Sequence, residues 1–103
     1  MYIKQSKESK HFFRIRNVYD NGGKTIDRYT VTFDIWNAGE KEWMPYVEND
    51  GCLCCMCMSG RPFGGQGAAL QGTCVEGRHL GERIKFADLP PDCQKCCLEY
   101  MEL

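Results

Sequence analysis

The sequence has no excess of charge of either sign: 13 lysines and arginines stand against 14 aspartates and glutamates, for a formal net charge of -1. Proteins that bind the nucleic-acid backbone generally depend on a cationic surplus, because much of their affinity comes from neutralised phosphates. General nucleic-acid binding is therefore disfavoured.

Long hydrophobic runs are also missing. No stretch approaches the roughly 20 apolar residues that a membrane-spanning helix requires, and the first ten residues are polar, with no hydrophobic segment of signal-peptide length. We therefore expect no membrane association and a cytoplasmic protein. In that reducing compartment the eight cysteines are expected to stay free thiols rather than to form a disulfide framework.

The chain also lacks any linker, internal repeat or low-complexity tract that would divide it. At 103 residues it is long enough to bury a core without disulfides or metal. We expect residues 1–10 to form a flexible polar tail and residues 11–103 to form a single α+β domain.

What the sequence does contain is a clear hairpin signal. Asn21-Gly22-Gly23 supplies the positive φ angles of a tight turn, with strand-like runs at 11–19 and 24–36 on either side. The second run alternates apolar and mostly polar residues, which predicts a strand with one face toward a core. The apolar, core-facing residues are Tyr29, Val31, Phe33 and Ile35.

The remaining pattern completes a mainly antiparallel sheet of four or five strands. Further strands are expected at 43–47, where Pro45 suggests a sheet edge, at 52–58 and at 82–86. Residues 61–78 carry five glycines and predict one long glycine-rich loop. A C-terminal helix, with Asp88 as its capping side chain, is expected to pack on the sheet. Its buried face is predicted to hold Cys93, Cys97, Tyr100 and Met101.

Two sequence blocks carry a resemblance: YDNGGKTIDRYTV at 19–31 and GRHLGERIKFADLP at 77–90, with a looser block at 58–67 between them. Over residues 13–98 the chain resembles a family of small proteins from bacteria, their phages and mobile elements. The resemblance implies a shared architecture for these polar groups and a prokaryotic or phage setting, but no activity. The cysteines at 52–57 depart from the family pattern.

The cysteine spacing leaves three interpretations open. Cys54 with Cys57, and Cys93 with Cys96, have the two-residue separation found in four-thiolate zinc sites. A strand at 52–58 would however send Cys54 and Cys57 to opposite faces. Core packing of free cysteine is therefore favoured over structural zinc, and a thiol redox site is the third alternative.

Polar residues in and beside the glycine-rich segments form the candidate ligand site. If the long loop folds over the hairpin, arginines could clamp an anionic or nucleotide-like ligand while glycine amides approach it closely. Exposed or cross-strand positions are the alternative for each residue taken alone. The candidate ligand-binding residues are Asp27, Arg28, Arg61, Gln66, Arg78 and His79.

Catalysis has little support, because no nucleophile, base or carboxylate pair shows a local signature, and we lean toward a protein that is not an enzyme. Phe12, Trp36 and Trp43 need not be core residues, and exposed they would mark a partner or self-association surface.

The sequence thus favours a cytoplasmic, non-enzymatic binding protein of phage or mobile-element type, holding a small anionic ligand or a host protein. One concrete version is a counter-defence protein that sequesters a host signalling nucleotide. The alternative is a zinc-stabilised interaction module using the cysteines. No cofactor is expected otherwise, and a homo-oligomer stays open.

Overall fold

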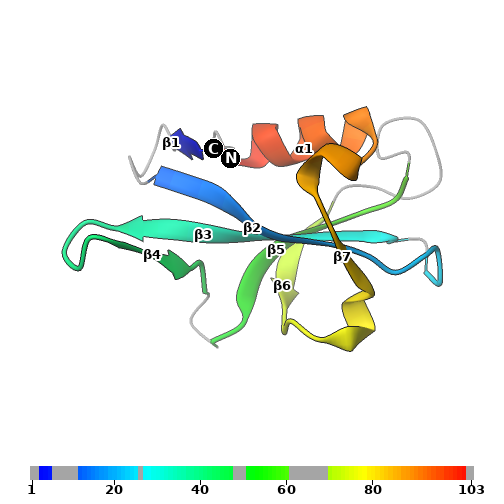
Figure 1. The fold of residues 1–103 in the computed structure, drawn as a ribbon, viewed down its shortest axis with the longest axis horizontal. Helices are drawn as coiled ribbons and strands as arrows, with labels where there is room; N and C mark the ends of the chain where they lie inside the picture. Colours follow the sequence, from blue (N-terminus) through cyan, green and yellow to red (C-terminus); the bar gives the residue numbers. More distant parts are fainter. Residues whose placement is uncertain (1–2, 6–11, 26, 48–50, 61–69, 102–103) are drawn as a thin grey trace.

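The computed structural model describes residues 3–5, 12–25, 27–47, 51–60 and 70–101 (Figure 1). In chain order, the elements are β1 (Ile3–Gln5), β2 (Phe12–Asp20), β3 (Tyr29–Asn37), β4 (Glu42–Pro45), β5 (Leu53–Met58), β6 (Leu70–Cys74), the 3-10 turn η1 (Arg78–Leu80), β7 (Glu82–Ile84), the 3-10 turn η2 (Phe86–Asp88) and α1 (Pro91–Met101).

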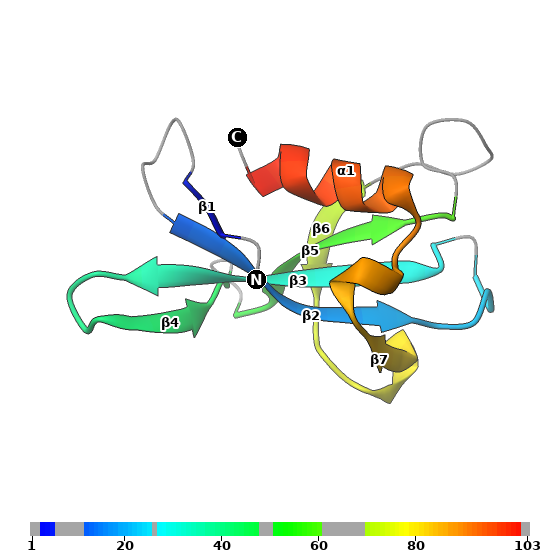
Figure 2. The same cartoon turned by 45° about the horizontal axis from the view of Figure 1, so that its top comes forward.

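The described strands form one seven-stranded sheet in which every pairing is antiparallel. The main order is β1-β2-β3-β5-β6, while β4 pairs with β3 and β7 pairs with β2. Helix α1 lies across one face of this sheet in both views (Figures 1 and 2). The α+β class and the C-terminal helix on the sheet are confirmed. No helix in the described part of the chain is long and apolar enough to cross a membrane.

The β2–β3 hairpin forms where the glycine signal predicts it. Asp20 pairs with Tyr29 in the ladder, and the amide of Asn21 donates to the carbonyl of Arg28 across the turn, at 3.0 Å. β3 therefore begins at Tyr29 rather than at Lys24, because the turn takes up the residues between them. A register shift between Ile15 and Asn17 marks a bulge in β2.

The core lies between the sheet and α1, as the alternation predicts. Val31 and Phe33 of β3 and Met58 of β5 are fully buried, and they meet the buried thiols of α1. Tyr29 is buried as well, whereas Ile35 is half-buried at the edge of the core. Burial of these large side chains supplies the main hydrophobic stabilisation of the domain.

The opposite face of β3 is also buried, which the expectation of a sheet with one buried face does not anticipate. Thr30, Thr32 and Asp34 alternate with the core residues, yet they too are shielded from water. Hydrogen bonds from Thr32 and Asn17 to Glu76 show that the chain after β6 returns beneath this face. The domain therefore has an apolar layer under α1 and a polar layer on the other side.

Three local expectations need correction or revision. Ile3–Gln5 form β1 and pair with β2, so these three residues do not behave as the flexible tail expected for 1–10. Leu70–Cys74 form β6 on the edge of β5, so the long loop predicted at 61–78 is wrong there. The Asp88 carboxylate accepts from the Lys85 amide at 3.1 Å and closes η2, instead of capping α1. Of the expected helix face, Cys93 and Cys97 are buried.

Candidate functional site

The β2–β3 turn is built by its own side chains. The Asn21 side-chain oxygen accepts from the amides of Gly23 and Lys24, at 2.9 and 3.1 Å, and an Asp20 oxygen accepts from Gly22 at 2.8 Å. Gly22 and Gly23 have φ of 78° and 87°, which side-chain-bearing residues rarely adopt. These turn amides already have acceptors within the turn. They are therefore less available to donate to a ligand than the amides of a glycine loop without such side-chain acceptors.

Arg28 is held by Asp20 rather than pointing freely to a ligand. Its Nε and Nη2 donate to the two carboxylate oxygens of Asp20 at 2.7 and 3.0 Å, a bidentate pair. This hydrogen bonding lowers the pKa of Asp20 against the opposing effect of burial. The ion pair fixes the turn against the start of β3, so the interpretation of Arg28 as a cross-strand partner is the one the geometry supports.

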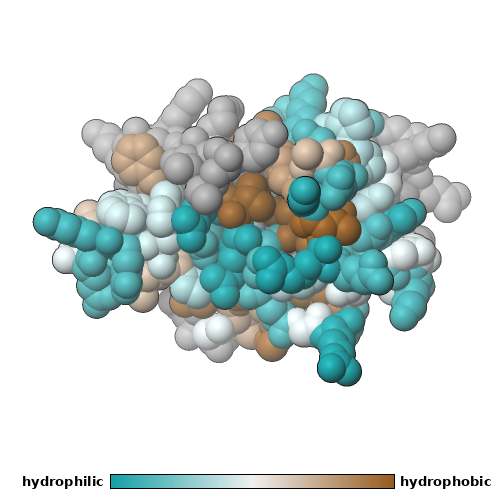
Figure 3. Space-filling view, viewed as in Figure 1, coloured by the Kyte–Doolittle hydropathy of each residue, from teal (hydrophilic) through white to brown (hydrophobic). Residues whose placement is uncertain are grey.

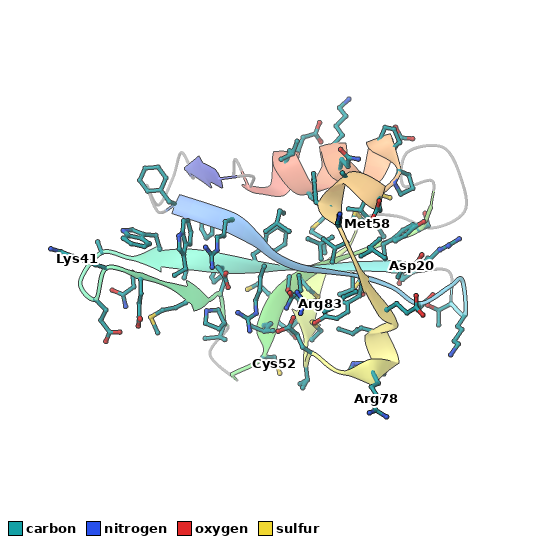
Figure 4. The ribbon with its side chains drawn as sticks, viewed as in Figure 1. Asp20, Lys41, Cys52, Met58, Arg78 and Arg83 are labelled. Atoms are coloured by element: carbon teal, nitrogen blue, oxygen red, sulfur yellow. The ribbon has the colours of Figure 1, made fainter. Side chains whose placement is uncertain are left out.

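A concavity of about 510 Å³ lies beside this turn. Two cationic residues line it, Lys24 from the turn and Arg78 from η1. The full lining is Asp20, Asn21, Gly22, Lys24, Arg78, Gly81 and Glu82. In Figure 4, Arg78 extends away from the sheet and not toward Asp20. The concavity therefore borders both positive and negative side chains, without an arginine clamp closed over it.

The six candidate ligand residues do not form one cluster in the described structure. Asp27 is half-buried and its carbonyl accepts from Asn21 and Thr25, whereas His79 is exposed on η1. Arg61 and Gln66 lie outside the described residues. The turn and η1 share the concavity, but only Lys24, which the sequence reasoning left out, joins Arg78 there as a second cation.

A larger concavity of about 810 Å³ lies along the β3–β4 hairpin. The hairpin, whose tip is at Lys41, extends past the end of α1 (Figures 1 and 4), so the helix does not cover it. We call this the apolar groove; it is lined by Phe12, Ile35, Trp36, Asn37, Ala38, Gly39, Met44, Pro45, Tyr46 and Val47. Phe12, Met44 and Val47 are 44, 36 and 49% exposed.

The aromatic residues expected at a partner surface behave differently from one another. Phe12 is exposed in the apolar groove, as that hypothesis requires. Trp36 and Trp43 are half-buried and pack edge to face with ring centroids 5.4 Å apart, and the Arg14 guanidinium lies 4.7 Å from the Trp43 ring. The face in Figure 3 is largely hydrophilic, with brown hydrophobic atoms between the helix and the sheet.

The polar layer under the sheet is centred on Glu76, a residue that sequence reasoning missed. Its carboxylate accepts from Arg16 Nε at 3.0 Å, Asn17 Nδ2 at 2.6 Å, Tyr19 Oη at 2.7 Å and Thr32 Oγ1 at 3.3 Å. Burial alone would raise the pKa of Glu76, but the hydrogen bonds from Asn17, Tyr19 and Arg16 outweigh it and lower the pKa to about 2.

The cysteines divide between the two layers. Cys93, Cys96 and Cys97 are buried in the core under α1, and burial raises the pKa of each thiol. Cys55 and Cys57 lie on the polar face of β5, opposite Thr32 and Thr30 of β3. Strand alternation thus separates Cys54 from Cys57, and the described residues contain no group of three or more histidines, cysteines or carboxylates placed to hold a metal ion.

Comparisons with protein-family models, with curated proteins and with solved structures returned no match. The function is therefore inferred from the geometry of the apolar groove, of the concavity beside the turn and of the two layers.

Proposed function

We propose that the protein is a small binding module whose main ligand is a partner protein seated in the apolar groove. The observation that carries this proposal is the combination of an 810 Å³ concavity with three large, exposed apolar side chains at its rim, Phe12, Met44 and Val47. Contiguous exposed apolar surface of this kind marks interaction sites in soluble proteins. Aromatic and methionine side chains are also enriched at the centres of such interfaces.

The groove favours a partner that inserts side chains over one that adds a strand. The Tyr46 amide donates to the Phe33 carbonyl, so the backbone groups of Tyr46 and Met44 point toward β3. Backbone groups alternate in direction along a strand, so those of Trp43 and Pro45 point to the outer edge of β4. Pro45 has no backbone N–H to donate, so that edge is poorly suited to pair with an added strand. The partner is therefore expected to present apolar side chains from a helix or a loop.

The resemblance to proteins of phages and mobile elements favours a partner in the host cell. The exposed carboxylates of Glu40 and Glu42 stand near the groove at the hairpin tip, around Lys41. A partner with a basic residue beside its apolar side chains would complement them, which affects association rate and specificity more than affinity.

Site-directed photo-crosslinking in the host cell tests the proposal. A photo-reactive amino acid at position 44 lies in the groove, and the same group at position 75 replaces Val75, an equally apolar residue that is 65% exposed and outside the groove lining. We expect one defined partner adduct from position 44 and none from position 75.

The identified partner is then purified and titrated against the variants. Met44→Asp should weaken its binding at least tenfold, because a carboxylate would be buried against apolar surface, while Val75→Asp should leave binding unchanged. An adduct that contains only a second copy of this chain, or equal crosslinking at both positions, would show that no host protein occupies the groove.

The second candidate is a nucleotide-like ligand in the concavity beside the β2–β3 turn. Its 510 Å³ volume is in the range of small-molecule sites, and Lys24 and Arg78 can meet a phosphate while Glu82 accepts from hydroxyl or amino groups. Sequestration of a host signalling nucleotide is the concrete form of this function.

Thermal melting with phosphate and a panel of nucleotides tests the second candidate. Ligand binding raises the melting temperature by mass action. Arg78→Ala and Lys24→Ala should abolish the rise, while Arg83→Ala, which removes a nearby exposed cation outside the lining, should retain it. A panel without any shift, or a shift that survives both lining variants, would count against this site.

A further inference from the structure

Two thiols on the polar face of β5 stand close enough to react with one another. Cys55 and Cys57 are two residues apart in the strand, so both point to the same side, and their Sγ atoms are 3.8 Å apart. Cys55 is fully buried, whereas Cys57 is half-buried and reachable from solvent. One thiol of the pair is therefore accessible and the other lies directly behind it.

The surroundings of the pair make the two thiols unequal. The hydrogen bond from Cys55 is the main cause that lowers the pKa of Cys57, to about 6, and the Thr30 hydroxyl adds to it, while burial and the Asp27 charge act in the opposite direction. The pKa of Cys55 is raised, because its proton is held by Cys57 and because it is buried. Near neutral pH this gives an accessible thiolate backed by a protonated thiol, and the thiolate is the reactive form.

A bridge between the two thiols would be strained. Two residues of a strand advance by about 6.6 Å, at the upper end of the roughly 4.4 to 6.8 Å that separates the Cα atoms of disulfide-bonded cysteines. Strained disulfides are oxidising and readily reduced, a property of catalytic and regulatory bridges rather than of structural ones. The pair is therefore suited to cycle between two states.

We propose that Cys57 and Cys55 form a thiol–disulfide exchange site that acts on low-molecular-weight disulfides. The Cys57 thiolate attacks one sulfur of the disulfide, which forms a mixed disulfide on Cys57 and releases the first thiolate. Cys55 then gives up its proton to that thiolate and attacks the Cys57 sulfur. The second thiolate leaves and takes a proton from solvent, and two thiols of the protein have been oxidised while one disulfide has been reduced to two thiols.

Cys74 is the competing partner for the second step. It lies on β6, where its neighbour in the ladder is Leu53, so it is diagonal to Cys55 across the strand pair. Burial raises the pKa of Cys74, so at neutral pH this thiol is less ionised than Cys57 and does not make the first attack. For the second step Cys74 is too far away, because the ladder neighbour of Cys57 is Leu70, four residues from Cys74 along β6, whereas the Sγ atom of Cys55 is 3.8 Å from that of Cys57. The structure therefore assigns the first attack to Cys57 and the resolving step to its neighbour in the same strand.

Reaction of the reduced protein with glutathione disulfide at pH 7, followed by acid quenching and peptide mapping, tests the assignment. We expect a Cys55–Cys57 bridge in the unaltered protein, a stable glutathione adduct on Cys57 in Cys55→Ser, and no reaction at position 55 in Cys57→Ser. Cys52→Ser changes a half-buried thiol just outside β5 and should behave like the unaltered protein.

Alkylation of the unaltered protein supplies a second measurement, which does not depend on a substitution that could affect folding. A thiol with a pKa near 6 should react with iodoacetamide about tenfold faster at pH 7 than at pH 5, whereas an ordinary thiol gains about a hundredfold over the same interval. Cys57 should be labelled first. A Cys55–Cys74 bridge, a persistent adduct in the unaltered protein, or labelling spread evenly over the eight cysteines would each overturn the proposal.

Discussion

Replacing Glu76 by glutamine is expected to destabilise the domain, because one carboxylate holds donors from β2 and β3 together. The four donors are Arg16, Asn17, Tyr19 and Thr32, and the side chain is only 19% exposed. Glutamine keeps a single acceptor oxygen and brings two amide hydrogens toward groups that are themselves donors. The variant therefore loses hydrogen bonds and leaves buried polar groups unpaired.

The size of the effect follows from the titration of this carboxylate. The pKa of Glu76 lies at about 2 in the folded protein against an ordinary value of 4.5, a difference of about 2.5 units. At about 1.4 kcal/mol per unit, the folded environment favours the charged form by about 3.5 kcal/mol. We expect Glu76→Gln to lower the free energy of unfolding at pH 7 by about 2 to 3 kcal/mol.

The pH dependence has a definite sign. Because the pKa is lowered on folding, the stabilisation is complete above about pH 4.5 and is lost as the pH falls toward 2. Urea unfolding followed by the fluorescence of Trp36 and Trp43 measures the free energy of unfolding at each pH. The difference between the unaltered protein and Glu76→Gln should be largest near pH 7 and should close as the pH approaches 2.

Glu40→Gln is the matched control, since Glu40 is exposed at the β3–β4 tip and the exchange is chemically the same. Its free energy of unfolding should change by less than about 0.5 kcal/mol. A Glu76→Gln effect no larger than that of the control, or a difference that stays constant between pH 7 and pH 3, would refute the interpretation of Glu76 as the organising acceptor of the polar layer.

Three further outcomes depend on single contacts. Gly81→Ala should cost more than about 2 kcal/mol in a denaturant titration, because a Cβ at its φ of 95° would collide with the Asp20 backbone, whereas Gly22→Ala, strained but in open space, should cost about 1 kcal/mol. In an ultraviolet titration, the Tyr19 phenol should ionise near pH 12, so its contribution to stability is lost as the pH rises from 10 to 12. Thr32→Val should cost about 1 to 3 kcal/mol in urea, because it leaves a backbone amide unpaired.

The elements that the sequence predicts well are those specified by neighbouring residues. Asn21-Gly22-Gly23 selects a turn through local geometry, and the alternation after it fixes which side of β3 meets the core. Cys54 and Cys57 lie on opposite faces of β5 for the same reason, because successive side chains of a strand point to alternate faces. Each of these features needs only a few consecutive residues to be recognised.

The elements that the sequence could not predict depend on partners far along the chain. β6 contains glycine and polar residues, and it becomes a strand only because the edge of β5 pairs with it. Glu76 is a single acidic residue between Val75 and Gly77, and its partners lie 44 to 60 residues earlier. No local pattern indicates such a role, so the sequence directs attention to the turn and the glycine-rich segment instead.

The polar layer and the thiol pair are parts of one structure, which connects the stability of the domain to its proposed chemistry. In the β3–β5 ladder, Thr32 pairs with Cys55 and Thr30 pairs with Cys57, and Thr32 also donates to Glu76. The segment that carries Glu76 beneath the sheet begins directly after Cys74. Loss of the Glu76 contacts would therefore loosen the cover over this face, and we infer that Glu76→Gln exposes Cys55 to alkylation. Such exposure would remove the asymmetry between the two thiols on which ordered exchange depends.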